Sequence, residues 1–132
     1  MLLYDTNIFL EILLDQERAS SCEKSLELMS DHQPGFVSQF SLYAIAAILG
    51  AKKKHLQILE QFFDFVETHP HLNVIPSTLR ENREICAIAE AQGLDFDDGL
   101  QYFIAKKESL VLVTLDKDFK RARGIKTLYP DS

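Results

Sequence analysis

Short apolar runs alternate with amphipathic stretches along this chain. The runs predict buried strands at residues 2–4, 36–38, 72–75 and 110–114, and a final edge strand at 127–129. Between them, helical periodicity predicts helices starting near Ile8 and near Ser20 or Ser21, then helices over 40–49, 52–68, 79–92 and 99–107. Because strands alternate with helices, the pattern predicts an α/β fold whose parallel sheet is covered by helices on both faces.

Some positions carry more specific expectations. Gly93 stands where the helix over 79–92 needs a left-handed residue at its end, and Leu79 is expected to face inward. The helix over 52–68 has a strong apolar face, which we expect to form core or a subunit interface. Its members are Leu56, Leu59, Phe62, Phe63 and Val66.

Composition sets the broad class of the protein. The chain has 132 residues, 46% of them hydrophobic and 26% charged, which is typical of one soluble globular domain spanning residues 1–132. No apolar run is long enough to cross a membrane, and the N-terminus lacks a basic secretory signal, so we expect a cytoplasmic protein. Cys22 and Cys86 fall in predicted helices without a zinc-binding spacing, which indicates two reduced, half-buried thiols.

The charge balance argues against a general nucleic-acid binder. The formal net charge is −6, whereas affinity for phosphate comes largely from Lys and Arg. Acidic side chains gathered around a metal ion would change this interpretation, because basic side chains could still line another surface. The positions of the acids therefore decide what the charge means.

Acidic residues follow predicted strands or open a predicted helix at three separate places. They are Asp5, the pair Asp97 and Asp98, and the pair Asp116 and Asp118. The carboxyl ends of parallel strands share one sheet edge, where α/β proteins bind ligands. Converging carboxylates repel one another and so imply a cation, and all-oxygen ligands favour Mg²⁺ or Mn²⁺. The alternative for each acid taken alone is helix capping.

Taken together, these segments resemble the PIN domain, whose small members include ribonuclease toxins of toxin–antitoxin pairs. The resemblance rests on Asp5-Thr6-Asn7 after a strand, Val37-Ser38 before a helix, Asp97-Asp98-Gly99-Leu100-Gln101, and Val113 to Phe119. It implies a three-layer α/β/α fold and Mg²⁺- or Mn²⁺-dependent cleavage of RNA. It also implies metal-binding and catalytic roles for Asp5, Asp98 and Asp116, with Asp118 as a further metal ligand. Supporting roles fall to Asn7, Ser38, Thr114 and Asp97.

The sequence departs from the PIN pattern at one position. Such domains usually carry a Glu six residues after the serine that matches Ser38, and here that position is Ala44. No acid lies between Phe36 and Gln57, so we expect weaker metal affinity. Glu11 is a candidate substitute if its side chain faces the site.

Two functions therefore remain open. The first is a metal-dependent endoribonuclease, restrained by a small antitoxin-like partner and forming a homodimer. Basic residues near Asp116 would guide RNA, unless they merely belong to a solvated terminal helix: Lys117, Lys120, Arg121 and Arg123. The second is a catalytically weakened or inactive PIN-like domain that serves in dimerisation or partner binding. A receiver or haloacid-dehalogenase-type domain fits less well, because each expects a further acid near Asp5 where Asn7 stands.

Overall fold

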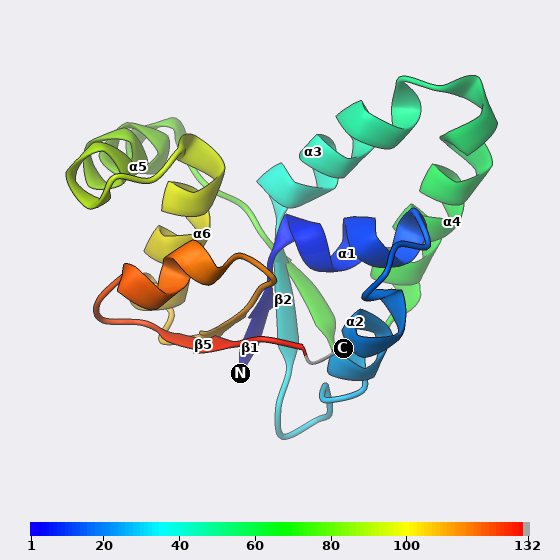
Figure 1. The fold of residues 1–132 in the computed structure, drawn as a ribbon, viewed down its shortest axis with the longest axis horizontal. Helices are drawn as coiled ribbons and strands as arrows, with labels where there is room; N and C mark the ends of the chain where they lie inside the picture. The colour runs from blue at the N-terminus through cyan, green and yellow to red at the C-terminus, as the bar shows by residue number, and fades with distance from the viewer. Residues whose placement is uncertain (131–132) are drawn as a thin grey trace.

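Five short strands form one parallel sheet in the computed structural model, which describes residues 1–130 (Figure 1). Their order across the sheet is β3-β2-β1-β4-β5, so the first strand of the chain lies at the centre. This confirms the parallel sheet that the sequence predicts. The strands are β1 (Leu2–Tyr4), β2 (Gly35–Ser38), β3 (Leu72–Ile75), β4 (Val111–Val113) and β5 (Lys126–Leu128).

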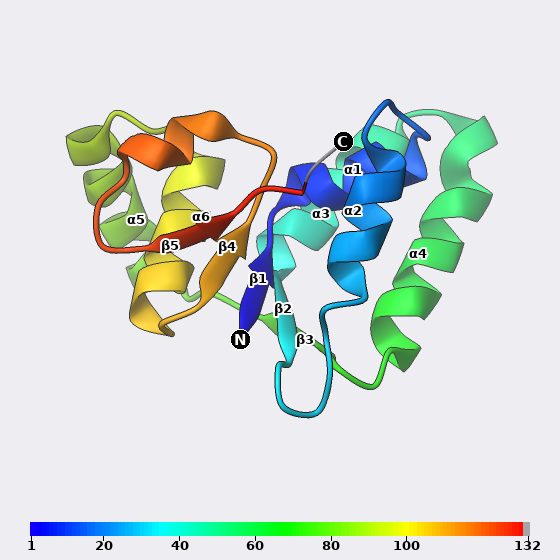
Figure 2. The same cartoon turned by 60° about the horizontal axis from the view of Figure 1, so that its bottom comes forward.

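Helices cover both faces of the sheet (Figures 1 and 2). One face is covered by α1 (Thr6–Leu13), α2 (Ala19–Leu26), α3 (Gln39–Gly50) and α4 (Leu56–Thr68). The other is covered by α5 (Leu79–Gln92) and α6 (Phe96–Lys107). Two 3₁₀ segments, η1 (Lys53–His55) and η2 (Lys117–Arg121), complete the chain order. The architecture is the three-layer α/β/α fold.

The central strands are buried on both faces, as their continuous apolar sequence requires. In β1, Leu2 and Tyr4 pack into the core beneath α1 to α4, while Leu3 points into the core beneath α5 and α6. In β4, Val113 and Leu112 divide between the two cores in the same way. The two-residue period of a strand thus supplies two hydrophobic cores from one sheet.

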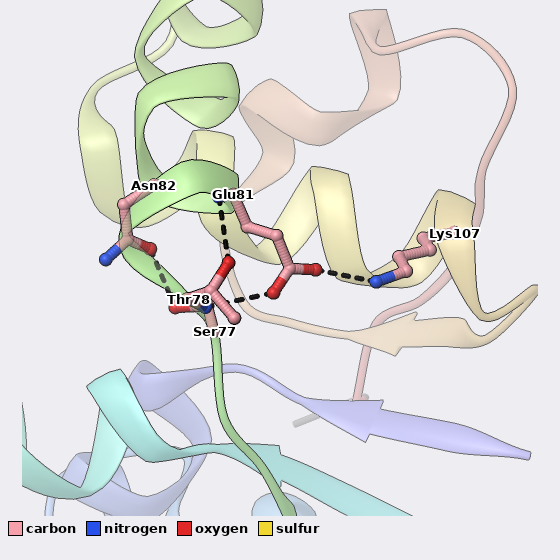
Figure 3. Close-up of polar contacts among 5 residues, drawn as sticks. All are labelled: Ser77, Thr78, Glu81, Asn82 and Lys107. Carbon is pink, nitrogen blue, oxygen red and sulfur yellow. Dashed lines mark hydrogen bonds and ion pairs between the residues drawn. The ribbon is translucent and has the colours of Figure 1, made fainter.

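Side-chain contacts join the start of α5 to the end of α6 (Figure 3). The Thr78 hydroxyl accepts from the Glu81 N–H, and the Glu81 carboxylate accepts from the Thr78 N–H, forming a capping box. Lys107 Nζ lies 2.6 Å from Glu81 Oε2, while Ser77 Oγ donates to Asn82 Oδ1 at 2.7 Å. Of these contacts, only the Lys107–Glu81 ion pair joins the two helices, and it places the end of α6 beside the start of α5.

Several local predictions need correction. The helix over 52–68 begins only at Leu56, because Lys52 is extended and a 3₁₀ turn intervenes. Leu79 is 84% exposed rather than inward, since it is the first residue of α5 and lies ahead of the face that packs. Ser20 and Ser21 lie inside α2 and do not cap it. Gly93, by contrast, has the expected left-handed backbone (φ 69°) at the end of α5.

The two cysteines differ from the half-buried pair that was expected. Cys22 is fully buried and Cys86 is exposed. Burial raises the pKa of the Cys22 thiol to about 11, so this cysteine behaves as a small apolar core residue. Among residues 1–130, no helix has the length and hydrophobicity needed to span a membrane.

Candidate functional site

Asp5 is a buried carboxylate at the end of the central strand. It directly follows β1, and only 2% of its surface is exposed. One oxygen, Oδ1, accepts from the Thr6 N–H at 2.7 Å and so caps α1. The other, Oδ2, accepts from the Thr114 hydroxyl, also at 2.7 Å. Capping therefore accounts for only one of the two oxygens, and the second is fixed by the neighbouring strand's end.

Thr114 connects the segments that follow β1 and β4. Its hydroxyl oxygen accepts from the Asp116 N–H at 3.0 Å and lies 3.4 Å from Asn7 Nδ2. Asn7 Oδ1 in turn accepts from the Leu115 N–H at 3.2 Å. The structure therefore brings together Asp5, Asn7, Thr114 and Asp116 at the carboxyl edge of the sheet, as two neighbouring parallel strands allow.

Asp97 and Asp98 lie in the first turn of α6, which begins three residues earlier than the predicted start at Gly99. Asp95 is the N-cap residue, and its Oδ1 accepts from the Asp98 N–H at 2.9 Å. Asp97 Oδ1 accepts from the Gln101 side chain at 3.2 Å. Because Asp95 caps the helix, capping does not explain the two acids that follow it.

Acids from three chain segments lie close enough to change one another's pKa values. Burial raises the pKa of Asp5 to about 7; the carboxylates of Asp97 and Asp116 add to the rise, while hydrogen bonds oppose it. Burial likewise raises the pKa of Asp98 to about 7, and Asp95, Asp116, Asp5 and Asp97 all contribute repulsion. The pKa of Asp97 is raised for the same main reason, its burial.

This donor set suits a hard divalent cation. Carboxylate oxygens without a nearby thiolate or imidazole are the ligands of Mg²⁺ and Mn²⁺, and a cation would offset both the burial and the repulsion that raise these pKa values. Within residues 1–130, however, no three acid, His or Cys side chains already stand close enough to form a complete ion-binding group. The acids share one edge but are not drawn together, so an ion would have to gather them.

Ser38 and three residues to which the sequence analysis gave no role, Thr6, Ser41 and Gln101, form a buried polar network beside these acids. Ser38 caps α3, and its hydroxyl accepts from the Ser41 N–H at 2.9 Å. The Ser41 hydroxyl lies within hydrogen-bond distance of Thr6 and Gln101 side chains. The four-residue spacing of Asp97 and Gln101 on a helix could have indicated their contact. The link to Ser41 could not be read from spacing, because 60 positions separate Ser41 from Gln101.

The position without the family acid has no acidic replacement on its own helix. Ala44 is half-buried on α3. The candidate substitute, Glu11, faces away from the acids, because its Oε1 accepts from the Arg18 N–H at 2.8 Å in the connection between α1 and α2. The acidic edge therefore consists of the acids after β1, after β4 and at the start of α6, which are Asp5, Asp116, Asp118, Asp97 and Asp98.

The segment after β4 carries the remaining candidates. Asp116 caps η2, with its Oδ1 accepting from the Asp118 N–H at 2.9 Å. Asp118 is exposed and pairs with Arg121 at 3.3 Å. Lys120 Nζ lies 5.3 Å from the centre of the Tyr129 ring. All four basic candidates are exposed: Lys117, Lys120, Arg121 and Arg123.

Known structures share this fold over nearly the whole chain. A VapBC2 complex from Rickettsia felis bound to promoter DNA contains a chain with a TM-score of 0.77, 22% identity and 98% coverage of both chains. The corresponding values are 0.75, 18% and 98% of both chains for a DNA-bound VapBC from Salmonella typhimurium. A toxin–antitoxin complex from Klebsiella pneumoniae gives 0.71 and 24%, covering 100% of this chain and 99% of the other.

The family assignment rests on the sequence as well as the fold. No curated protein is significantly similar to the chain. The sequence pattern of the PIN domain, however, matches residues 2–125, which include every acid of the site. The resemblance inferred from the strand-end motifs is thereby confirmed. The chain belongs to the PIN domain family.

Proposed function

We propose that this protein is a metal-dependent endoribonuclease that hydrolyses RNA phosphodiesters. The observation that supports the proposal is that Asp5 and Asp116 lie close enough to Asp98 to raise its pKa, in a chain of the PIN domain family. Each of the three acids comes from a different segment, and the carboxylates of Asp5 and Asp116 both repel that of Asp98. An arrangement that destabilises the empty site is expected where an ion is part of the function.

In the proposed site, Asp5, Asp98 and Asp116 hold Mg²⁺ or Mn²⁺, with Asp118 as a fourth contributor once it leaves Arg121. The bound ion supplies activation of water and stabilisation of charge on the phosphate during hydrolysis. Thr114 holds Asp5 Oδ2 in place. The remaining supporting residues fix the same edge through the hydrogen bonds described above, and they are Asn7, Ser38 and Asp97.

The RNA would approach along η2. Exposed cations in η2 and just beyond it offer phosphate contacts beside the acids: Lys117, Lys120 and Arg121 within η2, and Arg123 after it. Because the whole chain carries a net charge of −6, such contacts act locally rather than through the field of the whole molecule.

We further propose a small antitoxin-like protein as partner, since the similar structures include toxin–antitoxin complexes. An apolar groove of about 230 Å³ between α1, α2 and α4 suits an apolar helix of such a partner. Phe9, Phe62 and Phe65 line it, and Phe65 is 36% exposed. Leu56 and Phe63 of α4 are also exposed, which leaves apolar surface for a homodimer contact.

The deciding experiment incubates the purified protein with an RNA pool and Mn²⁺ or Mg²⁺, beside the Asp5→Asn and Asp116→Asn variants. We expect cleavage by the wild type alone, together with an ion-induced rise in its melting temperature. Equal cleavage by all three proteins would indicate a contaminating nuclease and refute the site assignment.

One observation favours a second function. Ala44 removes one acid of the family pattern, and Glu11 is held elsewhere by Arg18. A PIN-like domain with a weakened site would serve in dimerisation or partner binding through the same apolar surface. Absence of cleavage by the wild type, with no ion-induced change in melting temperature, would support this second function over the first.

A further inference from the structure

The Ser41 hydroxyl has hydrogen-bonding neighbours from three different elements. Thr6 Oγ1 of α1 lies at 2.8 Å, Ser38 Oγ at the end of β2 at 2.9 Å, and Gln101 Nε2 of α6 at 2.9 Å. A hydroxyl offers one proton and two lone pairs, so it donates to one neighbour and accepts from two. Because an amide nitrogen only donates, Ser41 must accept from Gln101. The direction of the bond is therefore fixed: Gln101 Nε2 donates and Ser41 Oγ accepts.

The Gln101 carboxamide is held between Ser41 and Asp97. Its Nε2 uses both protons, donating to Ser41 Oγ at 2.9 Å and to Asp97 Oδ1 at 3.2 Å. Turning the amide over would place Oε1 against the Asp97 carboxylate, where two acceptors would repel each other. An ionised Asp97 thus selects one orientation of the amide, and the amide in turn restrains Asp97.

These bonds connect two acids of the site through neutral groups. From Asp97 the path runs through Gln101 and Ser41 to the Thr6 hydroxyl, and the Thr6 N–H donates to Asp5. Ser41, Thr6 and Gln101 are all buried. Since buried hydrogen bonds of this kind restrict side-chain rotation, the position of Asp97 relative to Asp5 depends on Gln101.

The carboxamide oxygen of Gln101, Oε1, indicates which atoms of this side chain contribute to the network. Gln101 is fully buried, and within residues 1–130 its Oε1 has no hydrogen-bond partner. A buried acceptor without a partner is destabilising. Methionine would fill similar space without that penalty, so the favourable contribution of Gln101 lies in its two N–H donors. Ser41, which accepts from this amide, precedes Ala44 on α3 by one helical turn, and Ala44 is the position where the family acid is missing.

We propose that Gln101 is a positioning residue of the acidic edge, holding the Asp97 carboxylate in register with Asp5 on the side where Ala44 supplies no acid. This inference rests on the proposed metal-dependent function. Gln101 itself acts only through Asp97. Its loss should change the geometry of the acids more than the stability of the fold.

The first test compares Gln101→Met with Ile104→Val, which shortens another buried side chain of α6 away from the acids. Calorimetry measures Mn²⁺ affinity, and cleavage assays separate kcat from KM. We expect Gln101→Met to lower Mn²⁺ affinity and kcat by about tenfold each while KM stays unchanged, as for other hydrogen-bonded groups that surround the ligands of a metal site. Ile104→Val should change none of the three. Wild-type affinity and kcat in Gln101→Met would overturn the inference.

A second test asks whether Gln101 acts through Asp97. In an Asp97→Ala background, Gln101→Met should have little further effect on Mn²⁺ affinity, whereas full additivity would contradict the proposal. A readout without ion or RNA is hydrogen exchange of the Gln101 carboxamide by NMR. We expect slow exchange in the wild type and faster exchange in Asp97→Ala; equal rates would also contradict it.

The two proposals fail in different ways. A wild-type protein that neither binds Mn²⁺ nor cleaves RNA refutes the proposed function, and the role of Gln101 with it. An active wild type that Gln101→Met matches in every measurement refutes the role of Gln101 alone.

Discussion

The Thr114 hydroxyl donates a 2.7 Å hydrogen bond to Asp5 Oδ2 and so joins two positions 109 residues apart in the chain. Thr114 is fully buried and Asp5 nearly so. The same hydroxyl oxygen accepts from the Asp116 N–H. A single buried oxygen therefore sets the relative positions of two proposed metal ligands that follow neighbouring strands.

We predict that Thr114→Val destabilises the protein despite preserving shape and β-branching. The substitution leaves Asp5 Oδ2 and the Asp116 N–H without their buried partner. We expect the free energy of unfolding in urea to fall by about 1–3 kcal/mol. Thr114→Ser, which keeps the hydroxyl, should lose less. A valine variant as stable as the wild type would show that these bonds contribute nothing to stability.

The raised pKa values predict that the ion-free protein becomes less stable as the pH rises. Burial and neighbouring carboxylates hold the pKa of Asp5 and of Asp98 at about 7, against an ordinary value of 3.8. Between these values the folded chain binds more protons than the unfolded chain. The stabilisation is therefore complete below the ordinary value and is lost as the pH rises through about 7.

The measurement for this prediction is the melting temperature with a chelator from about pH 5 to about pH 8, repeated with Mn²⁺. We expect a decline with pH in the chelator and a smaller decline with the ion, because a cation stabilises the ionised carboxylates. A melting temperature that stays constant with the chelator would contradict the raised pKa values of the two acids.

We predict that Ala44→Glu strengthens ion binding. A carboxylate at this half-buried position of α3 would add a further acid to the edge. We expect Mn²⁺ affinity, measured by calorimetry, to rise by about tenfold, which corresponds to about 1.4 kcal/mol. Ala44→Gln, of nearly the same shape without charge, is the control. Equal affinities in the glutamate and glutamine variants would mean that position 44 does not reach the ion.

We predict that Gly99→Ala destabilises the protein although Ala favours helices by up to about 1 kcal/mol. A Cβ at Gly99 would lie 2.6 Å from the Ala89 Cβ and 3.3 Å from its Cα, so α5 and α6 would have to separate. We expect a loss of about 1–3 kcal/mol in the free energy of unfolding.

The control for this steric argument is Gly50→Ala, at the end of α3. A Cβ there meets nothing closer than a Leu59 methyl carbon at 3.8 Å, an ordinary contact. Thermal unfolding should therefore show Gly50→Ala to be neutral or slightly stabilising. If both alanine variants behaved alike, helix packing would not explain the effect at Gly99.

Much of the acidic edge could be predicted because the end of a strand can be located from the local sequence, and all parallel strands end at the same edge of the sheet. Asp5 and Asp116 follow apolar runs, and parallel strands bring such ends to one edge. The start of α6 was predicted three residues late, because several acids in succession can each act as a cap and sequence alone does not choose among them. The structure selects Asp95, which leaves Asp97 and Asp98 free of capping.

The buried polar network could not have been predicted in the same way. Ser41 lies on α3 and Gln101 on α6, two helices that cover opposite faces of the sheet. Their contact depends on how these helices approach each other at the sheet edge. The prediction that Leu79 faces inward was wrong for a related reason: helical periodicity identifies an apolar face but not how far along the helix the packing begins. The missed network and the wrong prediction for Leu79 both concern tertiary packing, which local periodicity does not encode.

The central position of β1 determines when the site can assemble during synthesis. β1 comprises residues 2–4, yet one of its two neighbours, β4, is made of residues 111–113. Closing so long a loop is slow compared with local helix formation, and it cannot begin until residues 111–113 have been translated. A nascent or truncated chain that stops before Thr114 therefore contains Asp5 without its hydrogen-bond partner and lacks Asp116 altogether. Premature termination products should consequently lack an assembled acidic edge.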